Sequence, residues 1–166
     1  KVPRREMDAL TPAEVRKFLE HVPVRWYAFF AVAITTGLRI GELLAMRWRN
    51  LDCTRGQYFV RETWQRPRGG RSASFSFPKT ESSIAPVDLP PEVLEALRTH
   101  RAAQSEEMLK AEGPYQEQDL IFATADGGPL DDAHIVQRVF RPALTAAALR
   151  RIRFHDLRHT TASLLI

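Results

Sequence analysis

Cysteine is almost absent from this sequence, since Cys53 is the only one. A single thiol cannot form a disulfide within the chain, which favours a reducing, intracellular compartment. Long apolar stretches are also absent: the longest run, residues 26–34, is much shorter than the roughly 20 residues of a membrane-spanning helix. The first residues do not have the pattern of a signal peptide, so none is expected. We therefore expect a cytoplasmic protein without a membrane anchor.

Lysine is scarce as well. Among the 24 lysine and arginine residues only Lys1, Lys17, Lys79 and Lys110 are lysines, and the formal net charge is +4. The guanidinium group of arginine is planar, stays charged and suits phosphate oxygens. The excess of arginine therefore indicates an anionic partner such as nucleic acid, although a source with arginine-rich proteins would produce the same excess.

The N-terminal part of the sequence predicts three helices. Thr11 and Glu14 have the spacing of a capping box at a helix start. Residues 25–36 are apolar almost all round, which is typical of a helix buried in the middle of a domain. Gly37 can adopt the left-handed conformation that ends such a helix. A third helix is expected over 40–47.

Strand-like sequence follows the helical part. Residues 58–60, 74–77 and 84–89 have the composition or the alternation of β-strands, and 66–71 is typical of a turn or flexible loop. Lys79 is therefore expected on an exposed connection between two strands.

The rest of the sequence predicts mostly helices. A long charged helix is expected from Pro91, and 120–122 is expected to be a short buried strand. Asp131 or Asp132 can cap the next helix. Asp156 is expected to cap a last helix that starts at the following residue.

Together these segments describe one domain over residues 1–166. Its hydrophobic content of 44% is enough for a core of ordinary size. We expect a mainly α fold with a small antiparallel β-sheet, that is, the α+β class.

Two imidazoles and a guanidinium lie close together near the end of the chain. The string His-Asp-Leu-Arg-His over 155–159 differs from the zinc-protease pattern His-Glu-x-x-His by Asp in place of Glu. His155 and His159 could thus hold a metal in a hydrolase. Asp156 is one methylene shorter than the usual base, and Arg158 would bring a positive charge close to a metal cation. A second alternative is that these histidines only cap and pack a helix start.

Arg39 adds a second fixed arginine. It follows the glycine that closes the buried helix, and Glu42 lies on the same face of the next helix, where it can hold the guanidinium. Two fixed arginines, a histidine and Lys79 would suit a phosphate on which negative charge develops. The residues by themselves therefore predict a phosphate-binding site without a metal.

These segments resemble known signature motifs. Residues 36–48, Thr-Gly-Leu-Arg-Ile-Gly-Glu-Leu-Leu-Ala-Met-Arg-Trp, are similar to the first box of the tyrosine recombinases, the phage integrase family. Residues 154–160, Phe-His-Asp-Leu-Arg-His-Thr, are similar to the second box, His-x-x-Arg, and Lys79 resembles the hairpin lysine of the family. The three follow one another in the family's order and spacing. The hairpin and the second box look more like those of phage and integrative-element integrases than those of chromosome-dimer-resolving recombinases.

The resemblance implies a site-specific recombinase that breaks and rejoins DNA. In such enzymes a tyrosine attacks the scissile phosphate, which gives a 3′-phosphotyrosyl link and frees a 5′-hydroxyl. By the matched positions, Arg39 and Arg158 would bind the phosphate and stabilise the transition state. Lys79 would protonate the leaving 5′ oxygen, and His155 would assist proton transfer.

The resemblance also implies supporting and missing parts. Glu42 and His159 would support the reacting groups, and no cofactor or metal is implied. Tyr27, Tyr58 and Tyr115 all precede the second box, whereas the family's nucleophile follows it, so none of the three is expected to attack DNA. We expect the tyrosine to lie beyond the given sequence and this catalytic-domain fold to be incomplete at its C-terminus.

Double-stranded DNA is the implied partner. Full-length members of the family act as tetramers on DNA, whereas this fragment, without the tyrosine and the amino-terminal core-binding domain, is expected to be unable to cleave DNA and can be monomeric. A relative that binds DNA without cutting it is the alternative. Candidate contacts to the DNA backbone are arginines, for each of which a solvated surface role is the alternative: Arg66, Arg68, Arg71, Arg138, Arg141, Arg150, Arg151 and Arg153.

Overall fold

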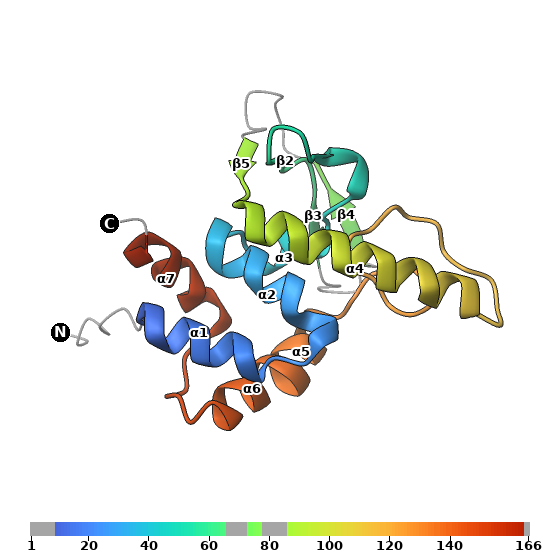
Figure 1. The fold of residues 1–166 in the computed structure, drawn as a ribbon. Coiled ribbons are helices and arrows are strands. Elements are labelled where there is room, and N and C mark those ends of the chain that lie inside the picture. Colours follow the sequence, from blue (N-terminus) through green and yellow to red (C-terminus); the bar gives the residue numbers. More distant parts are fainter. Residues whose placement is uncertain (1–8, 66–72, 78–85, 165–166) are drawn as a thin grey trace.

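The computed structural model describes residues 9–65, 73–77 and 86–164 (Figure 1). The α-helices are α1 (Pro12–His21), α2 (Val24–Thr36), α3 (Ile40–Leu44), α4 (Pro91–Lys110), α5 (Asp132–Ile135), α6 (Arg141–Ala146) and α7 (Leu157–Leu164). Shorter helical turns are η1 (Trp48–Asn50), η3 (Val136–Phe140) and η4 (Phe154–Asp156). The strands are β1 (Leu51–Asp52), β2 (Gln57–Phe59), β3 (Thr63–Gln65), β4 (Ser74–Ser76) and β5 (Pro86–Asp88). The expected class, mainly α with a small antiparallel β part, is confirmed.

The first two helices form as the sequence predicts. The Thr11 hydroxyl accepts a hydrogen bond from the Glu14 amide at 3.3 Å, and the Glu14 carboxylate accepts one from the Thr11 amide at 2.8 Å. This capping box starts α1. Helix α2 is apolar on nearly every face and lies in the middle of the fold, with α4 packed across it and α5 and α6 beneath (Figure 1). Gly37 ends α2 with a φ of 64°.

Helix α3 is shorter than predicted, because it ends at Leu44 and not at 47. The polar backbone groups that follow bond to other segments. The Met46 carbonyl accepts from the Ile121 amide at 2.8 Å, and the Arg47 amide donates to the Tyr58 hydroxyl at 3.1 Å. These bonds turn the chain out of the helix.

The antiparallel β part is confirmed, and among the described residues its strands are paired in two small sheets where the sequence predicted one. One sheet has the order β1-β2-β5, and the other pairs β3 with β4. Tyr58 lies opposite Val87 in the first sheet, and Trp64 lies opposite Phe75 in the second. The expected strand over 120–122 is also absent, since Leu120 forms only an isolated bridge with Arg47.

The second half of the chain is helical apart from one long connection. Asp131 caps α5, and its side chain accepts from the Ala133 amide at 3.0 Å. Helices α5 and α6 are joined through η3, which is a π-helical turn. Pro142 stands at the start of α6. Because proline has no N–H, a carbonyl of the preceding turn lacks its usual helical donor there. Within the described ranges, none of the helices combines the length and apolar character that crossing a bilayer requires.

Aromatic rings form the centre of the core. Phe30 of α2 contacts Phe18 of α1 edge to face, at 5.2 Å between ring centroids, and stacks on Phe140 of η3 at 5.8 Å. Phe154 of η4 lies 6.2 Å from the Phe30 ring. Each such ring pair adds about 0.5–1.5 kcal/mol to the stabilisation from area burial. One side chain of α2 thus joins the beginning, middle and end of the chain.

A buried ion pair attaches the β part to the helices. The Arg47 guanidinium donates from Nε and Nη2 to the Glu62 carboxylate, each at 2.8 Å, and Nη1 donates to the Gln118 carbonyl. The side chains of Arg47 and Glu62 are 10% and 4% exposed. The guanidinium also lies 4.6 Å from the centre of the Phe75 ring. Arg47 therefore contacts both the second sheet and the long connection before α5.

We expect Glu62→Ala to lower the free energy of unfolding by about 3–5 kcal/mol, because it leaves a buried guanidinium without its anion. Urea denaturation followed by circular dichroism measures the loss. Glu95→Ala is the matched control, since its partner Arg98 also binds a carboxylate but both side chains are exposed, at 62% and 67%. That control should cost less than about 0.5 kcal/mol. Equal losses in the two variants would contradict a structural role for the Arg47–Glu62 pair.

Candidate active site

The first part of the site is the sharp junction between α2 and α3. Gly37 has a φ of +64°, and a Cβ atom placed on it would lie 3.1 Å from Oγ1 of Thr161 in α7. Glycine is therefore favoured here both by its backbone conformation and by the close approach of α7. Leu38 is buried just after the turn, so the next residue is directed outward from a fixed backbone.

Arg39 is the first residue beyond this junction. Its backbone amide donates to the Glu42 carboxylate at 2.8 Å, and its Nη1 donates to the same carboxylate at 3.0 Å. The Arg39 side chain is 66% exposed, whereas that of Glu42 is 17% exposed. The structure thus contains the predicted Arg39–Glu42 contact. Because the side chain is largely exposed and, among the described residues, this guanidinium bonds to Glu42 alone, its other N–H groups can bind an anion.

The second part of the site is the turn η4 and the start of α7. Phe154 is buried in the aromatic cluster and fixes the turn, while His155 is exposed. Leu157 is buried and begins α7. Arg158 and His159 are partly exposed, and the rings of His155 and His159 lie 5.9 Å apart at 86°.

Two threonines attach α7 to the rest of the domain. The Thr161 hydroxyl donates to the Ile34 carbonyl of α2 at 2.7 Å, and the Leu10 amide donates to the Thr160 hydroxyl at 3.0 Å. Both threonines are buried. Arg158 lies about one helical turn before Thr161, and Thr161 contacts Gly37. The arrangement therefore brings the Arg158 turn of α7 to the end of α2 from which Arg39 projects.

The threonines were missed by reasoning from the sequence, although their positions carry a signal. Thr160 and Thr161 follow Asp156 and Leu157 at the spacing of one helix face. All four are buried. Polar residues on the inward face of a helix must find hydrogen-bond partners, and here those partners come from distant segments.

Arg158 differs from the other arginines near the site. Among the residues that the structure describes, its guanidinium has no hydrogen bond and no ion pair with a carboxylate. A partly shielded guanidinium with open donors is suited to an external anion, and its side chain is already oriented by a packed helix.

Asp156 has a different role from the predicted one. It was expected to cap α7, but its carboxylate accepts from the Arg153 amide at 2.8 Å and from Nη2 of the Arg153 guanidinium at 2.8 Å. It thus closes η4, one turn before α7. The hydrogen bonds from Arg153 hold the pKa of Asp156 below its ordinary value, and burial only partly opposes them.

The contact between Asp156 and Arg153 bears on the alternative that His155 and His159 hold a metal. His155 and His159 share one side of the turn, but the neighbouring Asp156 carboxylate is bound to Arg153. Over the described ranges, no group of three or more histidine, cysteine or acidic residues is arranged to hold a metal ion. The two histidines thus have no third ligand in that part of the chain.

Several predicted site residues lie outside the described residues. These are Lys79 and the loop arginines Arg66, Arg68 and Arg71. Their predicted roles stay predictions. The neighbouring strand ends are β3 at Gln65, β4 at Ser76 and β5 at Pro86.

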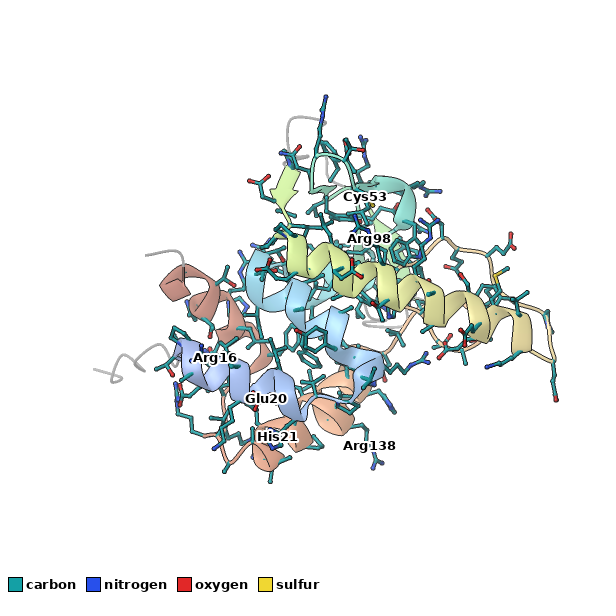
Figure 2. All side chains as sticks on the ribbon, viewed as in Figure 1. Arg16, Glu20, His21, Cys53, Arg98 and Arg138 are labelled. Carbon is teal, nitrogen blue, oxygen red and sulfur yellow. The ribbon has the colours of Figure 1, made fainter. Side chains whose placement is uncertain are left out.

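The remaining candidate arginines fall into two groups. Arg138, Arg141 and Arg151 are exposed, and Figure 2 shows Arg138 extending outward from the helical layer of α5 and α6. Arg150, by contrast, binds the Glu14 carboxylate at 2.6 Å and also donates to the Ala9 carbonyl. Arg150 therefore contributes to holding α1 against the segment after α6, whatever else it contacts.

The three tyrosines lie in a helix, a strand and a loop, as expected. Tyr27 is part of α2, and Tyr58 is buried in β2 with its hydroxyl accepting from the Arg47 amide. Burial raises the pKa of Tyr58. Tyr115 follows α4, and desolvation likewise raises its pKa. A raised pKa disfavours the phenolate that a nucleophile requires.

The fold is shared with the catalytic cores of tyrosine recombinases. The Tn1549 transposon integrase, solved in complex with circular intermediate DNA, matches with a TM-score of 0.78 at 21% identity, over 98% of this chain and 55% of that one. The XerA recombinase matches with a TM-score of 0.74 at 21% identity, over 99% of this chain and 51% of that one. The lambda integrase catalytic core matches with a TM-score of 0.57 at 21% identity, over 94% of this chain and 81% of that one.

The sequence defines the family directly. The phage integrase family matches residues 8–166, and the chain belongs to this family. It is 30% identical over 171 residues to a tyrosine recombinase XerC-like protein of Caldanaerobacter subterraneus. This match covers 96% of this chain and 44% of that protein. It is also 30% identical over 168 residues to the ICEBs1 integrase of Bacillus subtilis, over 98% of this chain and 44% of that protein. The chain therefore spans less than half the length of these relatives.

The Asp156 contact has a testable pH dependence. Because the folded pKa of Asp156 lies below its ordinary value of 3.8, its carboxylate stabilises the fold fully above that value and less as pH falls through the lower folded pKa. Asp156→Asn should therefore lower the free energy of unfolding by about 1 kcal/mol at neutral pH. The difference from wild type should shrink below about pH 4.

Urea denaturation of both proteins at neutral pH and near pH 3 checks this, since other titrating groups cancel in the difference. A difference that grows as the pH falls would contradict the assignment.

Proposed function

We propose that the chain is the catalytic domain of a site-specific DNA recombinase that works through a 3′-phosphotyrosyl intermediate. The observation that carries the proposal is the attachment of α7 to the end of α2 through Thr161. This attachment supports the proposal because Arg158 belongs to the same helix as Thr161, and Arg39 follows Gly37 by two residues. The Tn1549 integrase of the same fold was solved with DNA, and family membership adds that relatives are recombinases and integrases.

In this proposal the two arginines bind the non-bridging oxygens of the scissile phosphate. Arg39 approaches with the donors that Glu42 leaves open, and Arg158 approaches from the first turns of α7. Positive groups fixed in advance stabilise charge that develops in the transition state, because they need no reorganisation during the reaction. Glu42 orients Arg39 without reacting.

In this proposal His155 and Lys79 carry out the proton transfers. His155 is exposed at the turn before α7 and assists proton transfer, with His159 beside it. Lys79 protonates the 5′ oxygen that leaves when the tyrosine attacks. The nucleophilic tyrosine is proposed to follow the second box in the complete protein, and double-stranded DNA is the substrate. We further propose that the active assembly is a homo-oligomer on DNA, a tetramer in the complete protein.

The proposal predicts a strong dependence of cleavage on Arg158. In the product of the complete reading frame, Arg158→Ala should reduce covalent adduct formation on a nicked suicide DNA substrate by about a hundredfold or more, because it removes a donor to the developing charge. Gel separation of the adduct gives the rate. Arg98→Ala, which removes an exposed arginine of α4 (Figure 2), is the control and should leave the rate unchanged.

The outcomes separate the proposal from its alternative. If the Arg158→Ala variant formed the adduct at the wild-type rate, the assignment of Arg158 to the phosphate-binding site would be wrong. A wild-type protein that binds the substrate but forms no adduct would instead identify a relative that binds DNA without cutting it.

Lys79 can be tested as the general acid by changing the leaving atom. A 5′-sulfur leaves as a thiolate and needs no proton, so the Lys79→Ala variant should cleave an oxygen substrate about a hundredfold more slowly than wild type but a sulfur substrate at nearly the wild-type rate. Single-turnover cleavage of both substrates measures this. Lys110→Ala on α4 is the control for loss of a lysine. Equal impairment of Lys79→Ala on the two substrates would argue against the acid role.

A further inference from the structure

Arg153 has the same local arrangement as Arg39. Each residue precedes a helical turn in extended backbone, with ψ of 154° and 151°. Each donates its backbone amide at 2.8 Å to the carboxylate three residues ahead. Each guanidinium binds that same carboxylate, at 2.8 Å for Arg153 and 3.0 Å for Arg39.

The Arg153–Asp156 and Arg39–Glu42 pairs are also similar in solvent exposure. The side chains of Arg153 and Arg39 are both 66% exposed, whereas those of Asp156 and Glu42 are 6% and 17% exposed. In both pairs the acid is shielded by the fold and the arginine reaches into solvent. The guanidinium is therefore held at one edge while its other N–H donors stay available, which reduces the entropy lost when it binds an anion.

Arg153 and His155 are both exposed at the turn before α7. Along this segment Ile152, Phe154 and Asp156 are buried, and Arg153 and His155 are exposed. The three buried residues anchor the segment, and the two exposed side chains lie only two residues apart in it. An anion bound at His155 would thus have Arg153 as a neighbour along the chain.

Helix capping alone does not require this side chain. The cap consists of the Arg153 backbone amide and the Asp156 carboxylate, and any residue other than proline supplies that amide. The guanidinium also binds the shielded Asp156 carboxylate, but the Arg153 side chain is itself 66% exposed, so solvent screening limits what this contact adds to stability. A function outside the fold is therefore the better account of an arginine here.

We propose that Arg153 binds a phosphate of the DNA backbone beside the scissile phosphate, as a further arginine held in place for DNA. This inference rests on the proposed function. It singles out Arg153 from the neighbouring Arg150, whose guanidinium bonds to Glu14 and to the Ala9 carbonyl and which is 39% exposed. Among the described residues, the Arg153 guanidinium binds the carboxylate of its own turn, so it can reach DNA without breaking a contact between distant described segments.

The test is the salt dependence of DNA binding. Fluorescence anisotropy with a labelled DNA duplex gives the affinity of the chain across a series of salt concentrations. Arg153→Ala should weaken binding about tenfold at low salt and reduce the slope of log affinity against log salt by about 1, because one phosphate contact is lost. Arg153→Lys keeps the charge and should restore most of the slope.

Arg98→Ala is the matched control, because Arg98 also binds an acid of its own helix turn, Glu95, and is 62% exposed. It should leave the slope close to that of wild type. Thermal unfolding of each variant verifies that Arg153→Ala is folded, as expected for an exposed side chain.

Each result decides between the two proposals. If Arg39→Ala and Arg158→Ala lower the slope but Arg153→Ala behaves like Arg98→Ala, the inference about Arg153 is overturned and the proposed function stands. If the wild-type chain shows no salt-dependent binding to the duplex, both are overturned. A lower slope in Arg153→Ala that Arg153→Lys restores supports the inference.

Discussion

The structure depends on the packing of the aromatic rings around Phe30. Helix α2 is apolar on nearly every face, so its stability depends on other elements that cover most of its surface. Phe18, Phe140 and Phe154 do so from α1, η3 and η4. Because Phe154 belongs to the turn that carries His155, the burial of a hydrophobic helix also fixes the exposed chemical groups. Core and site are built by one set of contacts.

The position of the site follows from how α2 ends. A left-handed glycine allows the chain to turn and lets Thr161 of α7 approach to within 3.1 Å of the place of a Cβ. The hydroxyl of Thr161 then bonds to the Ile34 carbonyl. The arginines at 39 and 158 lie far apart in sequence, yet each projects from an element that this contact holds. If the two arginines act as proposed, their preorganisation is a consequence of packing, because Arg39 adjoins the packed end of α2 and Arg158 belongs to the packed helix α7.

Local signals in the sequence were enough to predict most helices, and distant contacts explain the failures. The capping box of α1 and the glycine after α2 each depend on residues that are close together in the sequence. Both predictions are confirmed. The early end of α3 and the loss of a strand at 120–122 both result from bonds between residues 46–47 and 120–121. Asp156 was misassigned for a related reason: a carboxylate beside two helical turns can cap either, and only the fold shows that it serves Arg153.

Burial distinguishes arginines that hold the fold from arginines that can bind a ligand. Arg47 and Arg39 each bind a carboxylate, but in different surroundings. The Arg47 side chain is only 10% exposed, and each of its three guanidinium nitrogens donates to Glu62 or to the Gln118 carbonyl, so it is directed into the fold and away from an outside group. Arg39 is 66% exposed and shares only one edge with Glu42. An arginine-rich composition therefore overstates the number of groups that can bind an anion. The arginines suited to this are those whose guanidinium is bound to a carboxylate on one side and exposed to solvent on the other, as Arg39 is.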